Sequence, residues 1–290
     1  MITRRRFLTL TAACLAAPAH AAPVTDWQGV GLGAALSLRL VGAEPAQAAR
    51  LFRKVEAMIA QIEATASLHR DSALTRLNRD GRLAWPSDDL QQILALADQV
   101  HRATDGAFDP TVQPLWQATA RGDDIGAAHA LIGWERVSRQ TDEIRLAQGQ
   151  ALTLNGIAQG WAADRIAALL RDEGFGHALI NMGEVQALGL RADGQPWQAS
   201  IQSPEGDEVA RCGLTNRALA TSSPRGTLIG AGQPHIMGPK GQAALWSTVS
   251  VSAGQAALAD ALSTAFCLME RPAIDRALRA FPDARLEAAI

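Results

Sequence analysis

The chain has no tyrosine and only three cysteines among 290 residues, and its formal net charge is −2. The absence of a polybasic face argues against a nucleic-acid-binding protein. The absence of any run of 18 or more apolar residues leaves no candidate for a membrane-spanning helix, so the protein is expected to be at most peripheral to a membrane. Cysteine and histidine do not cluster at metal-ligand spacing. The glycine-rich stretches match neither a Walker A nor a Rossmann fingerprint, which argues against the ordinary nucleotide-binding folds.

The first 21 residues have the composition of an export signal. Arginines at positions 4, 5 and 6 precede an apolar stretch from Phe7 to Ala17, and a small-residue cleavage site ends at Ala21. This order predicts a secretory signal, and consecutive arginines followed by Phe-Leu are typical of the twin-arginine type, which exports folded proteins. The alternatives are a basic amphipathic anchor and lipidation at Cys14. We therefore expect a signal peptide over 1–21, one mature domain over 22–290 and a periplasmic location.

Removal of this signal leaves two cysteines, Cys212 and Cys267. They could pair in an oxidising compartment, although nothing in their spacing requires a disulfide. Cys267 falls in an apolar stretch of helical periodicity, which favours a buried and unreactive thiol.

Helical and strand-like patterns alternate along the mature chain. Apolar residues recur at helical spacing in four segments: 44–65, Ser87 to about Gly106, 154–175 and 255–270. Strand patterns occupy four others: 27–42, 177–190, 197–204 and 246–253, the last as a half-buried strand. Residues 69–89 are expected to form a polar connecting segment, and 105–116 a rigid loop with two prolines. The strands look antiparallel, so we predict an α+β fold, with antiparallel sheets and packed helices in one compact unit.

The helix in 154–175 begins in an unusual way. Gly174 stands where a C-cap glycine belongs, and Asn155-Gly156 is typical of a helix start. Gly160, however, lies in the first turn, where glycine costs about 1 kcal/mol relative to alanine. One explanation is that the helix N-terminus lies against something bulky and anionic, such as a phosphate.

The last helix combines an apolar face with two oxygen-bearing side chains. Its apolar residues are Leu258, Leu262, Phe266 and Met269. Asp260 and Thr264 are four residues apart and therefore project from one face, which we expect to lie opposite the apolar one. A carboxylate and a hydroxyl are hard oxygen ligands that suit Mg²⁺. The alternative is a solvated aspartate with a threonine that hydrogen-bonds a backbone carbonyl.

Three further positions carry weaker signals. Asp109 precedes Pro110 and is expected to cap a turn. His235 lies in a loop, where histidine is either a polar filler or a catalyst. Residues 219–226 offer hydroxyls and backbone amides in a turn, as a phosphate-binding loop does.

Seven stretches taken together, and in this order, resemble the ApbE family, the FAD:protein FMN transferases. They are DSALTRLN (71–78), GAFDPTVQPLW (106–116), LNGIAQGWAADR (154–165), ALINMGEVQALG (178–189), LATSS (219–223), HIMGP (235–239) and STVSVSAGQAALADALSTAF (247–266). The resemblance covers nearly the whole mature chain. It is greatest to the branch associated with maturation of nitrous oxide reduction and similar respiratory flavoproteins.

The resemblance implies a reaction and a set of residues. Such enzymes bind FAD with Mg²⁺, split the pyrophosphate, pass FMN to a threonine hydroxyl of a partner flavoprotein and release AMP. Matching positions imply that Mg²⁺ is held by the backbone carbonyl of Gly156 together with Asp260 and Thr264, and that His235 stabilises charge or transfers a proton. The implied FAD contacts are Leu32, Leu68, Ala107, Phe108, Asp109, Thr153 and Gln159.

The sequence also departs from the family pattern. Gly238 replaces an aspartate in the loop after His235, and a threonine of that loop is missing. Leu68 stands in place of a common aromatic residue, Thr153 in place of an aspartate and Gln159 in place of a lysine. The proposed metal residues are unchanged. Two alternatives to protein flavinylation therefore stay open: an FAD pyrophosphatase without a protein acceptor, and a flavin-binding assembly factor or carrier that catalyses nothing.

Overall fold

The computed structural model describes residues 22–204 and 206–290, so the expected signal peptide and Cys14 lie outside the described residues. A seven-stranded sheet with the order β1-β2-β6-β7-β10-β13-β14 forms the centre, and each neighbouring pair of strands is antiparallel. Its strands are β1 (Val24–Gly31), β2 (Ala34–Val41), β6 (Ala178–Asn181), β7 (Val185–Leu188), β10 (Arg217–Ser222), β13 (Val249–Ala253) and β14 (Arg285–Ala289).

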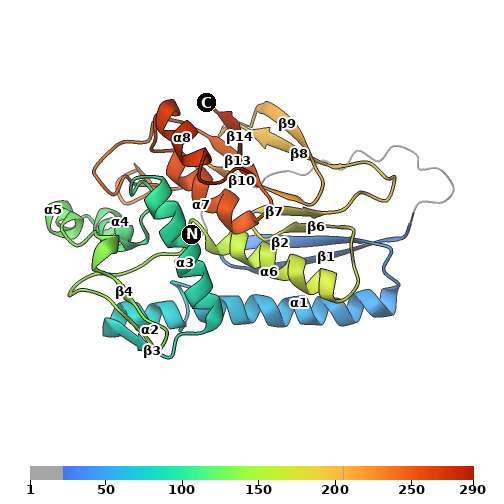
Figure 1. The fold of residues 1–290 in the computed structure, drawn as a ribbon, viewed down its shortest axis with the longest axis horizontal. Helices are drawn as coiled ribbons and strands as arrows, with labels where there is room; N and C mark the ends of the chain where they lie inside the picture. The colour runs from blue at the N-terminus through green and yellow to red at the C-terminus, as the bar shows by residue number, and fades with distance from the viewer. Residues whose placement is uncertain (1–21, 205) are drawn as a thin grey trace.

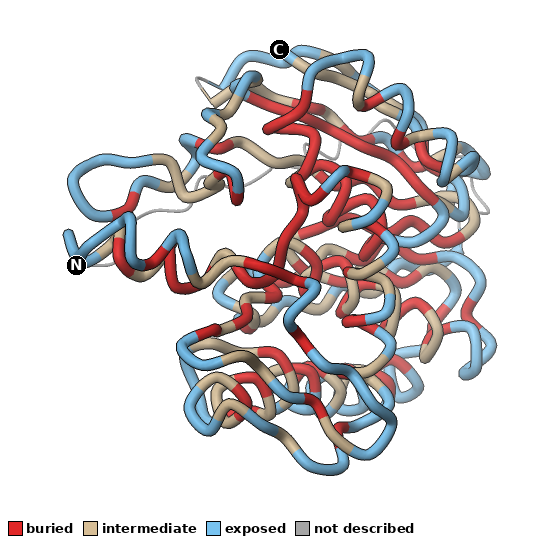
Figure 2. Tube along the Cα trace, turned by 60° about the vertical axis from the view of Figure 1, so that its left-hand side comes forward, coloured by how far each residue is buried: buried red, intermediate tan, exposed pale blue. Residues whose placement is uncertain are grey.

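Helices pack on one face of this sheet and a hairpin packs on the other (Figure 1). The helices are α1 (Pro45–Ala66), α6 (Ala158–Asp172) and α7 (Ala256–Phe266), and the hairpin consists of β8 (Trp197–Gln202) and β9 (Glu208–Leu214). Side chains alternate along β7, since Leu188 belongs to the helix-side core whereas Val185 and Ala187 belong to the hairpin-side core. The middle strands β6, β7, β10 and β13 are therefore largely buried on both faces, whereas every second residue of most of the edge strand β1 is exposed (Figure 2).

A group of smaller elements lies between α1 and α6 in the sequence and packs beside the helices (Figure 1). It comprises α2 (Ala73–Asp80), β3 (Arg82–Ala84), α3 (Asp88–Ala103), η1 (Pro110–Val112), α4 (Gln113–Arg121), α5 (Ile125–His129), η2 (Trp134–Arg136), β4 (Ser138–Arg139) and β5 (Glu143–Arg145). Apolar residues of α2 and α3 join the same core cluster as those of the large sheet. The other short elements of the described chain are β11 (Leu228–Ile229), β12 (Gln233–Pro234) and α8 (Arg271–Leu278).

The α+β prediction is confirmed, as are most of the elements with strong periodicity. Residues 27–42 lie in the hairpin β1–β2, and 44–65 form α1. Ser87 caps α3 by accepting a hydrogen bond from the backbone amide of Leu90. Gly174 adopts a φ of 83° just after α6, as expected of a residue that ends a helix in the left-handed conformation.

Several local predictions are wrong. Residues 69–89 are not merely a connecting segment, because they contain α2 and β3, and Ser72 and Thr75 form a reciprocal capping box at the start of α2. The loop 105–116 contains η1 and the beginning of α4. The helix that begins after Ser87 ends at Ala103, before two residues with positive φ.

The C-terminal predictions also need correction. The strand in 246–253 is β13, and every one of its residues is buried because β10 and β14 flank it and α7 covers it. The last helix ends at Phe266, and Met269 is buried beyond its end. Solvent therefore reaches less of this region than the sequence pattern indicates.

The structure gives a reason for Gly160 that needs no phosphate. A Cβ at this position would lie 2.3 Å from the carbonyl oxygen of Ala256 and 2.6 Å from the Cα of Ala257, at the start of α7. Glycine is required because the backbones of α6 and α7 touch here, and the cost in helix propensity is offset by close packing.

Gly160→Ala should therefore destabilise the protein. The added methyl group would collide with backbone that has no flexible side chain to move aside, and overpacking of this kind costs about 1–3 kcal/mol. Gly176→Ala is the matched control, since a Cβ there meets nothing within 4 Å. Urea unfolding should show a loss for the first variant only. Equal stability of the two variants would contradict the packing explanation.

The two mature cysteines are both free thiols. Cys267 is buried, as predicted, and burial raises its pKa to about 12. Cys212 lies in β9 and is half-buried, and burial raises its pKa to about 11. Within the described residues, no helix is long and apolar enough to cross a membrane.

Candidate functional site

The candidate site lies at the junction of α6 and α7, where each helix supplies a carboxylate to the other. Asp260 of α7 accepts a hydrogen bond of 3.1 Å from the amide of Gly160. Asp164 of α6 accepts bonds of 2.8 and 2.9 Å from the amides of Ala256 and Ala257 at the start of α7. These amides lack partners within their own helix, so the carboxylates satisfy them and fix the two helices together.

Asp260 is buried, with 4% of its surface exposed. Nearly every residue of α7 is buried, so the expected polar face of this helix is turned into the protein and the solvated-aspartate alternative is wrong. Burial, followed by the neighbouring Asp164, raises the pKa of Asp260 to about 7. Burial and then Asp260 also raise the pKa of Glu184 on the turn before β7 well above its usual value. A concentration of buried carboxyl groups favours a cation, because buried charges are normally paired or bound to metals.

The other two predicted metal residues lie beside each other. A Cβ on Gly156 would lie 3.0 Å from the Thr264 hydroxyl oxygen and 3.4 Å from the ring of Phe108. The Thr264 hydroxyl is also 3.3 Å from that of Ser222, which lies at the end of β10. Gly156 therefore leaves the space next to Thr264 that a side chain would fill.

The donor set fits a hard cation. It consists of one carboxylate and one hydroxyl spaced a helical turn apart, with a backbone segment that approaches them, and Mg²⁺ prefers such oxygen ligands while keeping others from water or phosphate. Among the described residues, no three His, Cys, Asp or Glu side chains form a metal-binding group. A cation at this site would therefore depend on the single charge of Asp260.

Two of the predicted FAD residues, Leu32 and Gln159, are in contact. Leu32 lies in the β1–β2 turn with a φ of 52°, and its carbonyl accepts a bond of 3.2 Å from the Gln159 amide. Its own amide donates to the Glu63 carboxylate at 2.9 Å. The second Glu63 oxygen is 3.4 Å from Arg70, which follows Leu68 by two residues. Glu63 therefore anchors both segments, and the sequence pattern of α1 does not single it out.

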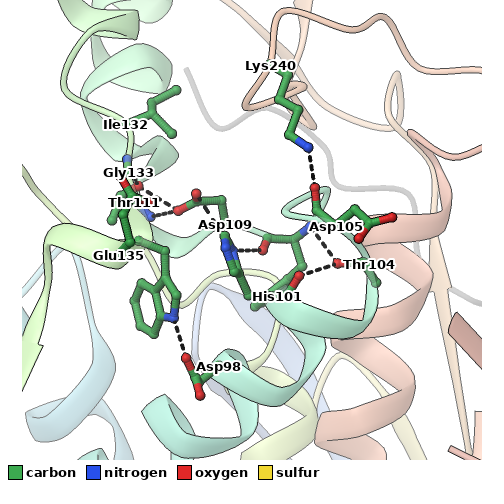
Figure 3. Close-up of polar contacts among 12 residues, drawn as sticks. Asp98, His101, Thr104, Asp105, Asp109, Thr111, Ile132, Gly133, Glu135 and Lys240 are labelled. Carbon is green, nitrogen blue, oxygen red and sulfur yellow. Dashed lines mark hydrogen bonds and ion pairs between the residues drawn. The ribbon is translucent and has the colours of Figure 1, made fainter. Parts of the chain in front are cut away.

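Of the remaining predicted FAD residues, three lie on the loop after α3, of which Figure 3 labels Asp109, whereas Leu68 lies between α1 and α2 and Thr153 lies before α6. Ala107, Phe108 and Asp109 are buried, and Thr153 donates a backbone bond of 2.8 Å to the carbonyl of Pro110. Asp109 caps η1, as predicted, because its carboxylate accepts from the amide and the hydroxyl of Thr111 at 2.8 and 2.6 Å. Burial raises the pKa of Asp109.

His101, in the last turn of α3, contacts this loop and is a residue that sequence reasoning misses. Its Nδ1 lies 2.9 Å from the carbonyl oxygen of Phe108 and 3.8 Å from a carboxylate oxygen of Asp109 (Figure 3). A carbonyl can only accept, so Nδ1 carries the proton. The sequence could have indicated His101 by its position in the last turn of a predicted helix, shortly before the loop of Phe108.

His235 has a defined tautomer. Its Nδ1 lies 2.9 Å from the carbonyl of Pro224 and 3.1 Å from that of Thr227, so Nδ1 is the donor and Nε2 carries the lone pair. Gly238, the departure in this loop, is enclosed: a Cβ there would lie 2.1 Å from the carbonyl oxygen of Gln242. An aspartate therefore does not fit this loop in its present conformation.

The buried Asp164 predicts how stability depends on pH. Burial raises its pKa from 3.8 to about 6, so between these values the folded state holds more protons than the unfolded state. The contribution of this group to the free energy of unfolding is then full below about pH 4 and falls as pH rises through about 6. Asp164→Asn should consequently be more costly at the acidic end of this range than at neutral pH. Urea titrations across the range, in EDTA, measure this, and a cost that grows with pH would contradict it.

Comparisons with known proteins identify the family and the fold. The model of the ApbE family matches residues 32–289, which include every predicted site residue. The chain belongs to the ApbE family. Among curated ApbE relatives, the FAD:protein FMN transferase of Salmonella typhimurium (strain LT2) is 31% identical over 204 residues, which cover 63% of this chain and 58% of that protein. The Haemophilus influenzae protein of the same name is 27% identical over 206 residues, covering 62% and 60%. The matched region thus spans less than two thirds of these relatives.

Solved ApbE structures have the same fold. The flavin transferase ApbE from Vibrio cholerae has a TM-score of 0.77 at 23% identity, covering 89% of this chain and 90% of that one. The Pseudomonas stutzeri flavinyl transferase ApbE, in its apo form, has a TM-score of 0.78 at 27% identity, with 89% of each chain covered.

Proposed function

We propose that this protein is an FAD:protein FMN transferase that requires Mg²⁺, modifies a threonine of a partner respiratory flavoprotein and releases AMP. One observation carries the proposal: Gly156 lies beside Thr264 of α7 and the ring of Phe108, and Asp260 of the same helix accepts a hydrogen bond from Gly160. That loop, with the Leu32–Gln159 contact, provides the segments that would bind FAD. The names of the relatives support the same activity.

The proposed reaction is a phosphoryl transfer. The threonine oxygen attacks the flavin-side phosphorus of FAD, the bond from that phosphorus to the bridging oxygen breaks, and AMP leaves with the bridging oxygen. The hydroxyl proton passes to Nε2 of His235, the nitrogen with the lone pair. Asp260, Thr264 and the carbonyl of Gly156 would hold Mg²⁺, which supplies neutralisation of charge as the phosphoryl bond breaks.

Incubation with FAD and Mg²⁺ separates this function from its alternatives. The acceptor is a fragment with the threonine, and the same fragment with alanine is the control. A flavinylated threonine fragment with AMP supports the transferase. AMP with free FMN, whichever fragment is present, would identify a pyrophosphatase, and bound but intact FAD would identify a carrier.

We also propose export by the twin-arginine route, on the sequence of the first 21 residues. Changing Arg4 and Arg5 to lysine should trap full-length precursor in the cytoplasm. Arg53→Lys, on the exposed side of α1, is the control for a simple arginine-to-lysine change. Cell fractionation with sizing of the protein measures the outcome. Normal periplasmic delivery of the double variant would overturn the twin-arginine route.

A further inference from the structure

We propose that Lys240 is a positioning residue. It joins the loop of His235 to the loop after α3, which contains Phe108 and would bind FAD. The Lys240 ammonium donates a hydrogen bond to the backbone carbonyl of Asp105, and this contact is here termed the Lys240–Asp105 clamp (Figure 3). The two residues are 135 positions apart. The catalytic role of the clamp rests on the proposed function. Whether the clamp exists can be measured without an activity assay.

The Asp105 end of the clamp is a strained turn. Asp105 and Gly106 adopt φ values of 50° and 76°, and the left-handed conformation is costly for a residue with a side chain. The amide of Gly106 donates to the carbonyl of His101 at 2.9 Å, and that of Ala107 donates to Thr104 at 3.0 Å. The amides of the turn are therefore already bonded to carbonyls in the last turn of α3 and just after it. The carbonyl of Asp105 is thereby left to face the other loop and accept from Lys240.

The Lys240 end is also fixed. Lys240 lies in a turn in which the amide of Gly241 donates to the carbonyl of Gly238 at 2.9 Å, while its own amide donates to the Gln242 side chain at 2.8 Å. Because Gly238 is enclosed by Gln242, this turn has little room to shift. The backbone of Lys240 is therefore held, and its side chain spans the gap.

Gly106 lies between the two side chains that reach the turn. A Cβ at this position would be 3.3 Å from the ring of His101 and 3.6 Å from Cε of Lys240. His101 in turn holds the carbonyl of Phe108 at 2.9 Å. A continuous set of contacts thus runs from the His235 loop through Lys240 and Gly106 to the Phe108 segment. Without the clamp, the loop of His235 should move away from the Phe108 segment, which would bind FAD. Asp260 should stay in place.

The chain offers an unusually direct test, because Lys54 and Lys240 are its only two lysines. Lys54 itself donates to Glu173 on the surface, so a free model amine in the same tube serves as the standard. Competitive acetylation of the whole protein, read by mass spectrometry, should show Lys240 reacting about fivefold more slowly relative to that amine than it does in urea, which is the protection that one hydrogen bond gives. Gly106→Ala, checked for folding by circular dichroism, should remove this protection. An unprotected Lys240 in the native protein would overturn the clamp, whatever the activity of the enzyme.

The catalytic role is tested by Lys240→Met, with Lys240→Arg as the conservative variant and Lys54→Met as the control. Lys240→Met should lower kcat on the order of tenfold, since small misplacements of reacting groups are costly, and change the KM for FAD little. Arginine should restore most of the rate because it can donate to the same carbonyl, and Lys54→Met should match wild type. A Lys240→Met enzyme with wild-type kcat, or one that arginine does not rescue, would overturn the positioning role. If wild type itself transfers no FMN, the proposed function fails, and the acetylation result still decides the clamp.

Discussion

Replacing Asp260 by asparagine is expected to abolish FMN transfer while leaving the protein folded. Asparagine keeps an oxygen that can accept from the amide of Gly160, but it removes the charged member of the proposed ligand set. Losing the charge stabilisation that a bound metal provides should lower the single-turnover rate on the order of 10³-fold or more. Mg²⁺ should raise the melting temperature of wild type, because a ligand stabilises the state that it binds. It should not raise that of Asp260→Asn.

The stability of this variant in EDTA gives an independent reading. Wild type keeps Asp260 buried with a pKa raised to about 7, so removing the carboxyl group should not lower the melting temperature at neutral pH. Asp275→Asn, an exposed carboxylate on α8, is the matched control and should behave as wild type in every assay. Retention of near-normal transfer by Asp260→Asn at low Mg²⁺ would show that the metal site lies elsewhere.

His235→Ala is expected to slow transfer on the order of 10²-fold, the usual effect of removing one general acid–base group. FAD affinity should change much less, because the Leu32–Gln159 contact and the α6–α7 junction do not depend on this side chain. His129→Ala, an exposed histidine at the end of α5, is the control. The measurements are single-turnover transfer and equilibrium FAD binding for each variant.

An unchanged rate in His235→Ala would remove this residue from the mechanism. The polar-filler interpretation of the loop histidine would then hold.

Much of the fold follows from local sequence signals. The helix after Ser87 was predictable from a capping hydroxyl and apolar periodicity, and α1 from apolar periodicity alone, because both signals act over a few residues. The segment 69–89 was not, since its polar composition hides α2, whose two buried leucines are a small part of the pattern. Short strands such as β4 and β5 lack the length for a recognisable alternation.

The helical spacing of Asp260 and Thr264 was visible in the sequence, but their association with Gly156 was predicted only through the family resemblance. Asp260 and Gly160 are 100 residues apart, and nothing in either local pattern shows that one accepts a hydrogen bond from the other. The same holds for the burial of α7, whose polar face meets other elements in place of water. Gly160 illustrates the reason well: its cost in helix propensity was visible in the sequence, but the backbone of Ala256 that requires it was not.

The most direct test of the central claim follows the flavin-side phosphorus. Wild type is mixed in a single turnover with Mg²⁺, a threonine-bearing acceptor fragment and FAD that carries a phosphorus label on the flavin side only. The proposed mechanism predicts that the label appears on the acceptor threonine and that unlabelled AMP is released in equal amount. Label recovered in free FMN, or retained in intact FAD, would contradict it.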